Sequence, residues 1–91
     1  TQNGVMNLRN KKWEDDFTEL DPTGTSYVDH QYSRAYVRHL IHAQEMLGLE
    51  ILSIHNLAFY LWLVGEARKH ILAGDFKAWK EQMVVKLARR L

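Results

Sequence analysis

The feature that most constrains this chain is an eight-residue run, residues 57–64, in which every side chain is apolar or aromatic. We expect it to lie in one helix that runs from Ser53 to Gly74. Ser53 or Asn56 would cap the start of this helix, and Gly74 in the left-handed conformation would close it. A helix that is apolar all round must be surrounded by other elements. A chain of 91 residues supplies few of these, so the sequence predicts that the helix needs partners from a larger assembly.

Length and composition restrict the class of protein. Ninety-one residues, 46% hydrophobic and 25% charged, are typical of one folded domain rather than a disordered chain. The run 57–64 is shorter than the roughly 20 residues that cross a bilayer, so we expect no membrane partner. The chain shows no secretory signal pattern. Because Thr1 is not a start methionine, we expect the chain to be a piece of a longer protein. It has no cysteine, which excludes disulfides and thiolate metal sites and is compatible with a reducing compartment. We expect the protein to be cytoplasmic.

The net charge of +1 conceals a gradient along the chain. Residues 1–31 carry three Lys or Arg against six Asp or Glu, whereas residues 32–91 carry nine against five. The basic part is compatible with a polyanionic partner. The alternative is a solvated helix face, and the residues alone favour this alternative.

We expect two regions, an arm with a loop at residues 1–31 and a helical subdomain at residues 32–91. The alternation in Val5–Leu8 predicts one or two short strands in the arm. Trp13 and Phe17 are expected to anchor this otherwise irregular segment on the helices. The predicted fold class is therefore mainly α, a three-helix unit with a short irregular or β N-terminal arm.

The turn formers in residues 20–26 predict a loop. The next helix is expected to begin near Asp29 or Ser33 and to end or break at Gly48, and a short connector over residues 49–52 would then lead into the apolar helix. A last helix, capped by Asp75, would place on its apolar side Phe76, Trp79, Met83, Val84 and Leu87.

No set of residues by itself indicates catalysis. His39 and His42 lie three residues apart, but no HExxH pattern accompanies them, so surface histidines are favoured over metal ligands. Asp15 and Asp16 could form an acid pair, but they lie in a charged segment that we expect to be exposed. His55 stands near the start of the apolar helix, where a buried ring needs a hydrogen-bond partner such as a carboxylate or a backbone group.

Several longer strings keep a definite spacing over nearly the whole chain. They are Met6-Asn7-Leu8-Arg9-Asn10, Asp15-Asp16-Phe17, Leu20-Asp21-Pro22, Tyr32-Ser33-Arg34-Ala35-Tyr36-Val37-Arg38-His39-Leu40, Glu45-Met46-Leu47-Gly48 and His55-Asn56-Leu57-Ala58-Phe59-Tyr60. With these strings the chain resembles the C-terminal part of bacterial tRNA-guanine transglycosylases, also called queuine tRNA-ribosyltransferases. The resemblance implies a larger (β/α)8-barrel enzyme that exchanges a guanine in the anticodon loop of certain tRNAs for a queuosine-precursor base. The family's two catalytic aspartates lie on the barrel upstream of such a segment, so we expect the 91 residues alone to be inactive.

The chain departs from the zinc site that the resemblance implies. The family pattern is Cys-x-Cys-x2-Cys followed by a histidine 26 residues later, and the matching positions here are Gly24, Ser26, Asp29 and His55. Only the histidine is retained, so we predict that no zinc is bound and that the protein has no cofactor. We expect the Asp29 carboxylate near the His55 ring, or packing around Tyr27, to hold the loop to the helix instead.

The resemblance also implies partners. Related enzymes are homodimers, and the matching aromatic cluster would be Tyr32, Tyr36 and His39, although packing within this unit is an equally good interpretation. The other partners would be the upstream barrel of the same chain and tRNA. The cations that could meet tRNA phosphates are Arg34, Arg38, Lys77, Lys80, Lys86, Arg89 and Arg90.

Two interpretations from other functional classes stay open. The chain could be a stand-alone helical module that binds a protein, or a small RNA-binding domain that uses its basic terminal helix. An upstream region encoding a barrel would favour the enzyme over both.

Overall fold

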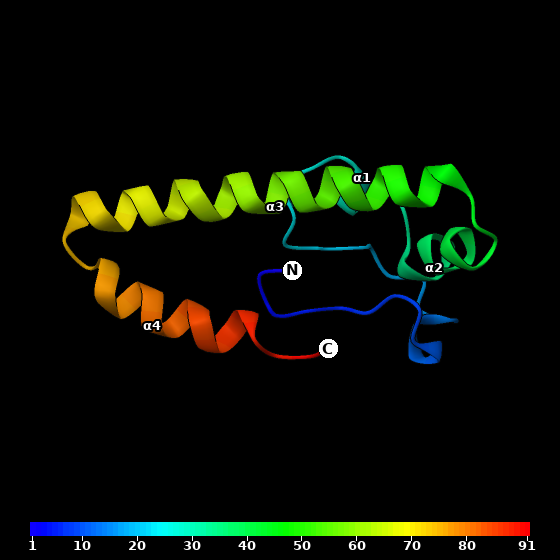
Figure 1. The fold of residues 1–91 in the computed structure, drawn as a ribbon, viewed down its shortest axis with the longest axis horizontal. Helices are drawn as coiled ribbons and strands as arrows, with labels where there is room; N and C mark the ends of the chain where they lie inside the picture. Colours follow the sequence, from blue (N-terminus) through cyan, green and yellow to red (C-terminus); the bar gives the residue numbers. More distant parts are fainter.

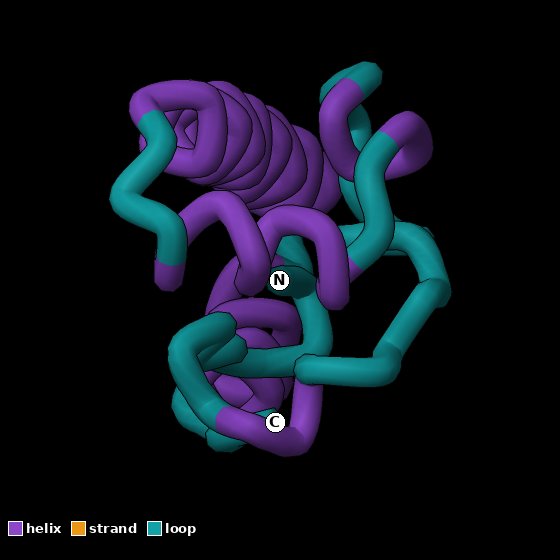
Figure 2. The backbone as a smooth tube through the Cα atoms, turned by 90° about the vertical axis from the view of Figure 1, so that its right-hand side faces the viewer, coloured by secondary structure: helices purple, strands orange, loops and turns teal.

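The computed structural model describes residues 1–91, which form helices and loops with no sheet (Figures 1 and 2). The elements are the 3-10 turn η1 (Lys11–Trp13) and the α-helices α1 (Val28–Gln31), α2 (Arg34–His42), α3 (Met46–Ala73) and α4 (Phe76–Leu87). The mainly α class predicted from the sequence is confirmed, with α1 as a single additional turn. In Figure 1, α3 runs along one side of the molecule, α1 and α2 lie near its beginning, and α4 folds back beneath its end.

Helix α3 begins earlier than the sequence suggests. It starts at Met46 and continues through residues 49–52, so the predicted connector is part of the helix. Ser53 and Asn56 lie inside α3 and do not cap its start, so that expectation is wrong. The predicted end is correct, because Gly74 adopts a φ of 80° and its backbone N–H bonds back to the last turn.

Gly48 does not break a helix but allows two helices to come close together. A Cβ atom at this position would lie 3.0 Å from the Cβ of Leu40 on α2, a tighter contact than packed side chains normally make. The chain turns before this point, through Ala43 and Gln44, and Gln44 takes the left-handed conformation with a φ of 57°. The expectation that Gly48 would end the preceding helix is therefore wrong. The missing side chain of Gly48 allows α3 to pack closely against α2.

The other helix ends follow the sequence more closely. Ser33 caps α2, since its hydroxyl oxygen accepts the backbone N–H of Tyr36 at 3.1 Å. Asp75 does occupy the position before α4, but its carboxylate makes no capping bond. It accepts a hydrogen bond from His70 Nδ1 at 2.8 Å and so joins the end of α3 to the start of α4.

The N-terminal arm forms no strand, so the prediction for residues 5–8 is wrong. The arm instead meets the other end of the chain, and the two termini lie close together in Figure 1. Val5 donates its N–H to the Arg89 carbonyl at 2.7 Å and accepts from the Leu91 N–H at 2.8 Å. This is a single parallel bridge between two short tails, too short to form a sheet.

The hydrophobic core lies at one end of the molecule. Trp13 is 7% exposed and takes the anchoring role expected of it, whereas Phe17 is 77% exposed and does not. Partly buried side chains such as Met6 and Tyr32 pack around the core. Its seven buried members are Leu8, Trp13, Leu20, Val28, Val37, Leu40 and Ile51.

The apolar run of α3 is not surrounded within this chain. Leu57, Tyr60, Leu61 and Val64 are each more than 60% exposed. Of the fourteen buried residues, Met83 on α4 is the only one that lies after position 55. As expected from the sequence, the chain itself does not supply enough packing partners to cover the apolar run of α3.

By length and composition, α3 is also the one helix that could cross a membrane. The apolar run 57–64 is shorter than a membrane span, but the helix that contains it extends for 28 residues. Length and composition are the whole of that evidence, and the central helix of a soluble protein has the same properties. Here the first turns of α3 are already covered by protein, since Gly48, Ile51 and His55 are buried.

Candidate functional site

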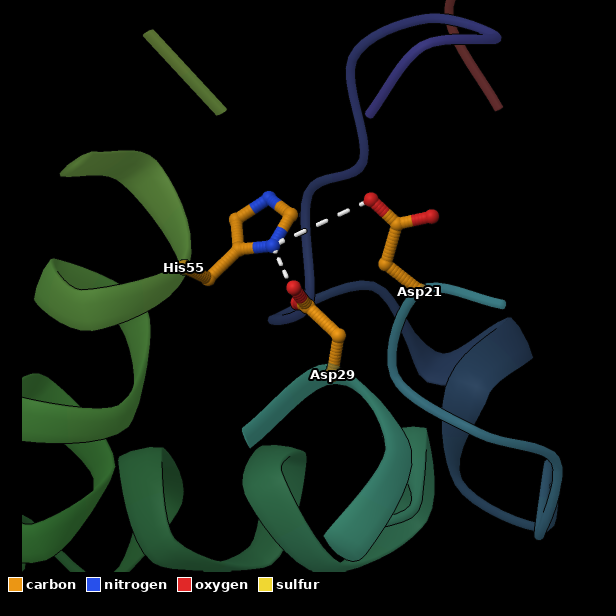
Figure 3. Close-up of side chains that lie close together, drawn as sticks. All are labelled: Asp21, Asp29 and His55. Carbon is orange, nitrogen blue, oxygen red and sulfur yellow. Dashed lines mark hydrogen bonds and ion pairs between the residues drawn. The ribbon is translucent and has the colours of Figure 1, made fainter. Parts of the chain in front are cut away.

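The loop before α1 folds around the carboxylate of Asp29, which points toward the His55 ring (Figure 3). The Asp29 side chain is 1% exposed. Its Oδ2 accepts hydrogen bonds from the Ser26 backbone N–H at 3.1 Å and the Ser26 hydroxyl at 2.6 Å. Its Oδ1 lies 2.5 Å from Nδ1 of His55 on α3. The contact expected between Asp29 and His55 is therefore present. Tyr27 is 64% exposed, so packing around that ring is not what holds the loop.

Backbone geometry brings Asp29 to this place. The N–H of Asp21 bonds to the Asp29 carbonyl at 3.2 Å, and the N–H of Gly24 bonds to the Asp21 carbonyl at 2.9 Å. Gly24 passes so close to the carboxylate that a Cβ there would lie 2.1 Å from Asp29 Oδ2. The loop can therefore close around Asp29 only because position 24 has no side chain.

A second carboxylate, Asp21, completes the site. It is 2% exposed, and its Oδ2 lies 3.9 Å from His55 Nδ1. Its Oδ1 accepts from the backbone N–H of Thr23 at 3.0 Å and from the Thr23 hydroxyl at 2.6 Å. Sequence reasoning missed this residue because polar residues of a turn are usually exposed. The available signal was the order Asp-Pro-Thr, since an aspartate often bonds to the backbone two residues later.

Asp29 orients the His55 ring. Carboxylate oxygens accept hydrogen bonds, so Nδ1 must be the donor toward Asp29. The ring also stacks on Phe59 one turn further along α3, at 6.5 Å between centroids and 15° between planes. An imidazole held on one nitrogen and one face has a fixed orientation, and this joins α3 to the loop.

The residues present do not fit a structural zinc site. Asp21, Asp29 and His55 could each offer a ligand atom within 4.8 Å of the others. Two ligands of one tetrahedral zinc, each about 2.1 Å from the metal, lie roughly 3.4 Å apart. Asp29 and His55 approach to 2.5 Å, which leaves space for a proton and none for an ion. Gly24 has no donor atom, and the Ser26 hydroxyl is bonded to Asp29.

The aromatic residues expected at an interface lie on or next to α2. Tyr32 and Tyr36 stack with centroids 5.8 Å apart and planes 13° apart. Tyr36 is 42% exposed, and His39 is exposed as well, whereas Tyr32 packs partly against the core. The structure thus brings the two tyrosines together and leaves both interpretations of them in place.

Arg34 is held within the fold. Its Nη1 lies 3.2 Å from Asp16 Oδ2, its Nε donates to the Leu20 carbonyl at 3.3 Å, and its guanidinium lies 5.0 Å from the centre of the Trp13 ring. Hydrogen bonds from the hydroxyl and the backbone N–H of Thr18, with a smaller contribution from Arg34, lower the pKa of Asp16 against the opposing effect of burial. The carboxylate of Asp16 is therefore kept ionised, which suits an ion pair better than a general acid.

The remaining expected cations lie apart from this centre. Arg38 is half-buried and donates from Nε to the Asn10 carbonyl at 3.2 Å. Lys86 is half-buried on α4. None of the expected cations of α4 and the tail pairs with an acid, and the exposed ones are Lys77, Lys80, Arg89 and Arg90.

Comparison with known proteins places the chain in a family. A family model described as queuine tRNA-ribosyltransferase matches residues 1–89. The chain is 40% identical over 91 residues to the queuine tRNA-ribosyltransferase of Aquifex aeolicus, which covers all of this chain and 24% of that protein. It is 43% identical over 81 residues to that of Lactococcus lactis subsp. cremoris strain SK11, covering 89% of this chain and 21% of the relative. The chain thus spans between a fifth and a quarter of the length of these relatives.

These matches cover the strings that carried the resemblance and the loop–helix site around His55. The resemblance to the C-terminal segment of tRNA-guanine transglycosylases is confirmed. The chain belongs to the queuine tRNA-ribosyltransferase family.

Proposed function

We propose that this chain is the C-terminal subdomain of a transferase that exchanges an anticodon-loop guanine of tRNA for a queuosine-precursor base. The family match over residues 1–89 is the observation that carries this proposal. The chain supports the catalytic barrel rather than performing the chemistry, because it contains no set of residues arranged for base exchange. In the cell we place the protein in the cytoplasm, a reducing compartment that suits a chain without cysteine.

The exposed side of α3 supports a barrel partner. Apolar residues at Leu57, Leu61 and Val64 are spaced three and four apart, so they lie along one stripe of the helix. They are 63%, 66% and 62% exposed, which is more apolar surface than a stable monomer usually leaves open along one helix. The upstream part of the same protein, which the relatives' length implies, would cover this stripe.

Dimerisation is the second role that we propose. Stacked aromatic side chains are strong interface anchors, and Tyr32 with Tyr36 forms such a stack beside the exposed His39. Tyr36→Ala in the protein with its natural flanking sequence should raise the dissociation constant of the dimer, as measured by sedimentation equilibrium. Tyr27→Ala is the matched control, because Tyr27 is also exposed but lies outside this cluster. Equal effects of the two substitutions would contradict this role.

Docking of tRNA is the third role. The exposed cations of α4 and the tail have no acidic partners, so they are available to phosphate oxygens. Arg34 and Arg38 contribute less in this proposal, because both already bind groups of the protein. Replacement of Lys86, Arg89 and Arg90 by alanine should raise the KM for tRNA and flatten its dependence on salt. Lys69→Ala, which removes a cation paired with Glu66, should leave both unchanged.

Base exchange itself tests the enzyme assignment. Labelled guanine should enter tRNA in the presence of the protein with its natural flanking sequence, and residues 1–91 alone should give no exchange. Exchange by residues 1–91 alone would contradict the supporting role. A gene that encodes no barrel would favour the alternative, a stand-alone helical module for a protein or RNA partner.

A further inference from the structure

We propose that this protein holds its loop to α3 without a metal ion, by a buried anion that collects hydrogen-bond donors. The anion is the carboxylate of Asp29, and the donors are the Ser26 N–H, the Ser26 hydroxyl and His55 Nδ1. The loop from Asp21 to Asp29 and the helix α3 are thus joined at one point, which is 1% exposed.

The charges of this site are the reverse of those in a metal centre. Around a metal ion, side chains direct lone pairs inward toward a cation. Around Asp29, they direct N–H and O–H groups inward toward a negative charge. Positions 26 and 55 take part in the Asp29 arrangement with donor groups rather than as ligands. Hydrogen bonds to an ionised acceptor are the stronger kind, so one carboxylate can join three donors effectively.

Gly24 and Asp29 depend on each other. The carboxylate fills the space that a side chain at position 24 would occupy, since a Cβ there would lie 2.1 Å from Oδ2 and 2.3 Å from the carboxyl carbon. A larger residue at position 24 therefore excludes the Asp29 arrangement. The missing side chain at position 24 and the acid at position 29 therefore belong together, and they leave Asp29 bonded to His55 at a distance too short for an ion between the two atoms.

The functional consequence is independence from metal supply and from thiol oxidation. No thiolate and no ion takes part, so chelators and peroxide have nothing to remove or oxidise at this site. The loop would stay ordered under conditions that dismantle a site built from cysteine and zinc. This inference does not rest on the proposed enzyme activity, because its tests measure metal content and thermal stability.

Metal analysis gives the first test, on the protein with its natural flanking sequence. We expect well below one zinc per chain by elemental analysis, and a Tm that EDTA leaves unchanged. The triple variant Gly24→Cys, Ser26→Cys and Asp29→Cys keeps His55 and should take up about one zinc per chain, with a Tm that then falls with EDTA. One metal ion per wild-type chain with a chelator-sensitive Tm would overturn the proposal. So would a rise in wild-type Tm with Mn²⁺ or Mg²⁺, or a triple variant that takes up no zinc.

Two alanine substitutions give the second test. Gly24→Ala should displace the Asp29 carboxylate, lower the Tm by about 5–10 °C and speed hydrogen exchange at the Ser26 amide. Gly65→Ala is the control, because Gly65 is an exposed helical glycine with no atom within 4 Å of its added Cβ. It should leave the Tm unchanged or slightly raised. Equal stability of the two variants, or an unchanged Ser26 exchange rate in Gly24→Ala, would overturn the proposal.

Discussion

The two ends of this molecule are built differently. Up to His55, residues from the arm, the loop, α1, α2 and the first turns of α3 share one core and one buried polar site. Beyond His55, α3 and α4 form a hairpin in which Met83 is the one buried residue. At the turn of the hairpin, His70 contacts Asp75 and stacks on Trp79 at 5.0 Å between ring centroids.

The difference shows which end holds the core. The first end buries a cluster of seven apolar side chains and pairs the buried carboxylates of Asp21 and Asp29 within the chain, although Trp13 Nε1 has no hydrogen-bond partner. The hairpin leaves apolar residues exposed on both helices, including Leu61 on α3 and Val85 on α4. An amphipathic element without a partner gains most of its stability by packing, so the hairpin is expected to gain order when it docks.

The largest expected contrast comes from truncating one apolar residue at each end. Ile51→Ala should lower the free energy of unfolding by about 2–5 kcal/mol, because Ile51 is 1% exposed and a cavity would remain. Leu61→Ala should lower it by about 0.5 kcal/mol or less in residues 1–91, because Leu61 is already 66% exposed. Chemical denaturation of both variants measures the difference. Similar losses would show that the hairpin packs as tightly as the core.

A smaller contrast separates the cations of the two ends. Arg34→Lys should cost about 1 kcal/mol of unfolding free energy, because lysine cannot bond to Asp16 and the Leu20 carbonyl together while it lies over the Trp13 ring. Lys69→Ala at the other end should cost a few tenths, about 0.3 kcal/mol, since Lys69 is 75% exposed and meets only Glu66. Denaturation curves test both variants. A larger loss for the Lys69 variant would reverse the comparison.

A substitution at the turn of the hairpin is expected to destabilise α4 alone. His70→Ala removes the bond to Asp75 and the stacking on Trp79, which should loosen α4 by up to about 1 kcal/mol while leaving the core unchanged. Hydrogen exchange of the α4 amides should rise, and exchange in α2 should not. Lys77→Ala is a suitable control, because Lys77 is exposed on the same helix and has no ion-pair partner. An equal rise in both helices would contradict this division.

The smallest expected effect depends on pH and concerns the surface of the loop. The carboxylate of Glu19, followed by the Gly24 carbonyl, raises the pKa of His30 above its usual 6.5. The contribution of this pair to stability is therefore fully present below about pH 6.5 and is lost as the pH rises through the raised pKa of the folded protein. An NMR titration of the His30 ring checks this, and Glu19→Gln should lower the pKa. An unchanged pKa in that variant would exclude Glu19 as the cause.

Sequence reasoning was successful where local chemistry decides the structure. The cap at Ser33 and the left-handed Gly74 follow from residue type and spacing. The contact between Asp29 and His55 was expected from the positions that match the family's zinc pattern. Sequence reasoning failed where tertiary contacts decide. Gly48 is a helix breaker by propensity, but close packing against Leu40 places it inside α3.

The same limit explains the other errors. The arm has an alternating pattern, yet its neighbour is a short tail from the far end of the chain, and Val5 makes one bridge instead of a strand. Asp21 is buried by the fold of a loop whose composition indicates exposure. The roles of Tyr36 and Lys86 depend on molecules outside the chain, so those predictions stay predictions.

The close crossing at Gly48 has a mechanical consequence for the whole molecule. Helix α3 is about 42 Å long and lies against α2 in its first turn, where Gly48 contacts Leu40. A change of about 5° in the angle of the helix at this contact would move its last turn by roughly 4 Å. The close contact that Gly48 allows therefore helps to determine where α4 and its positively charged side chains lie relative to the core.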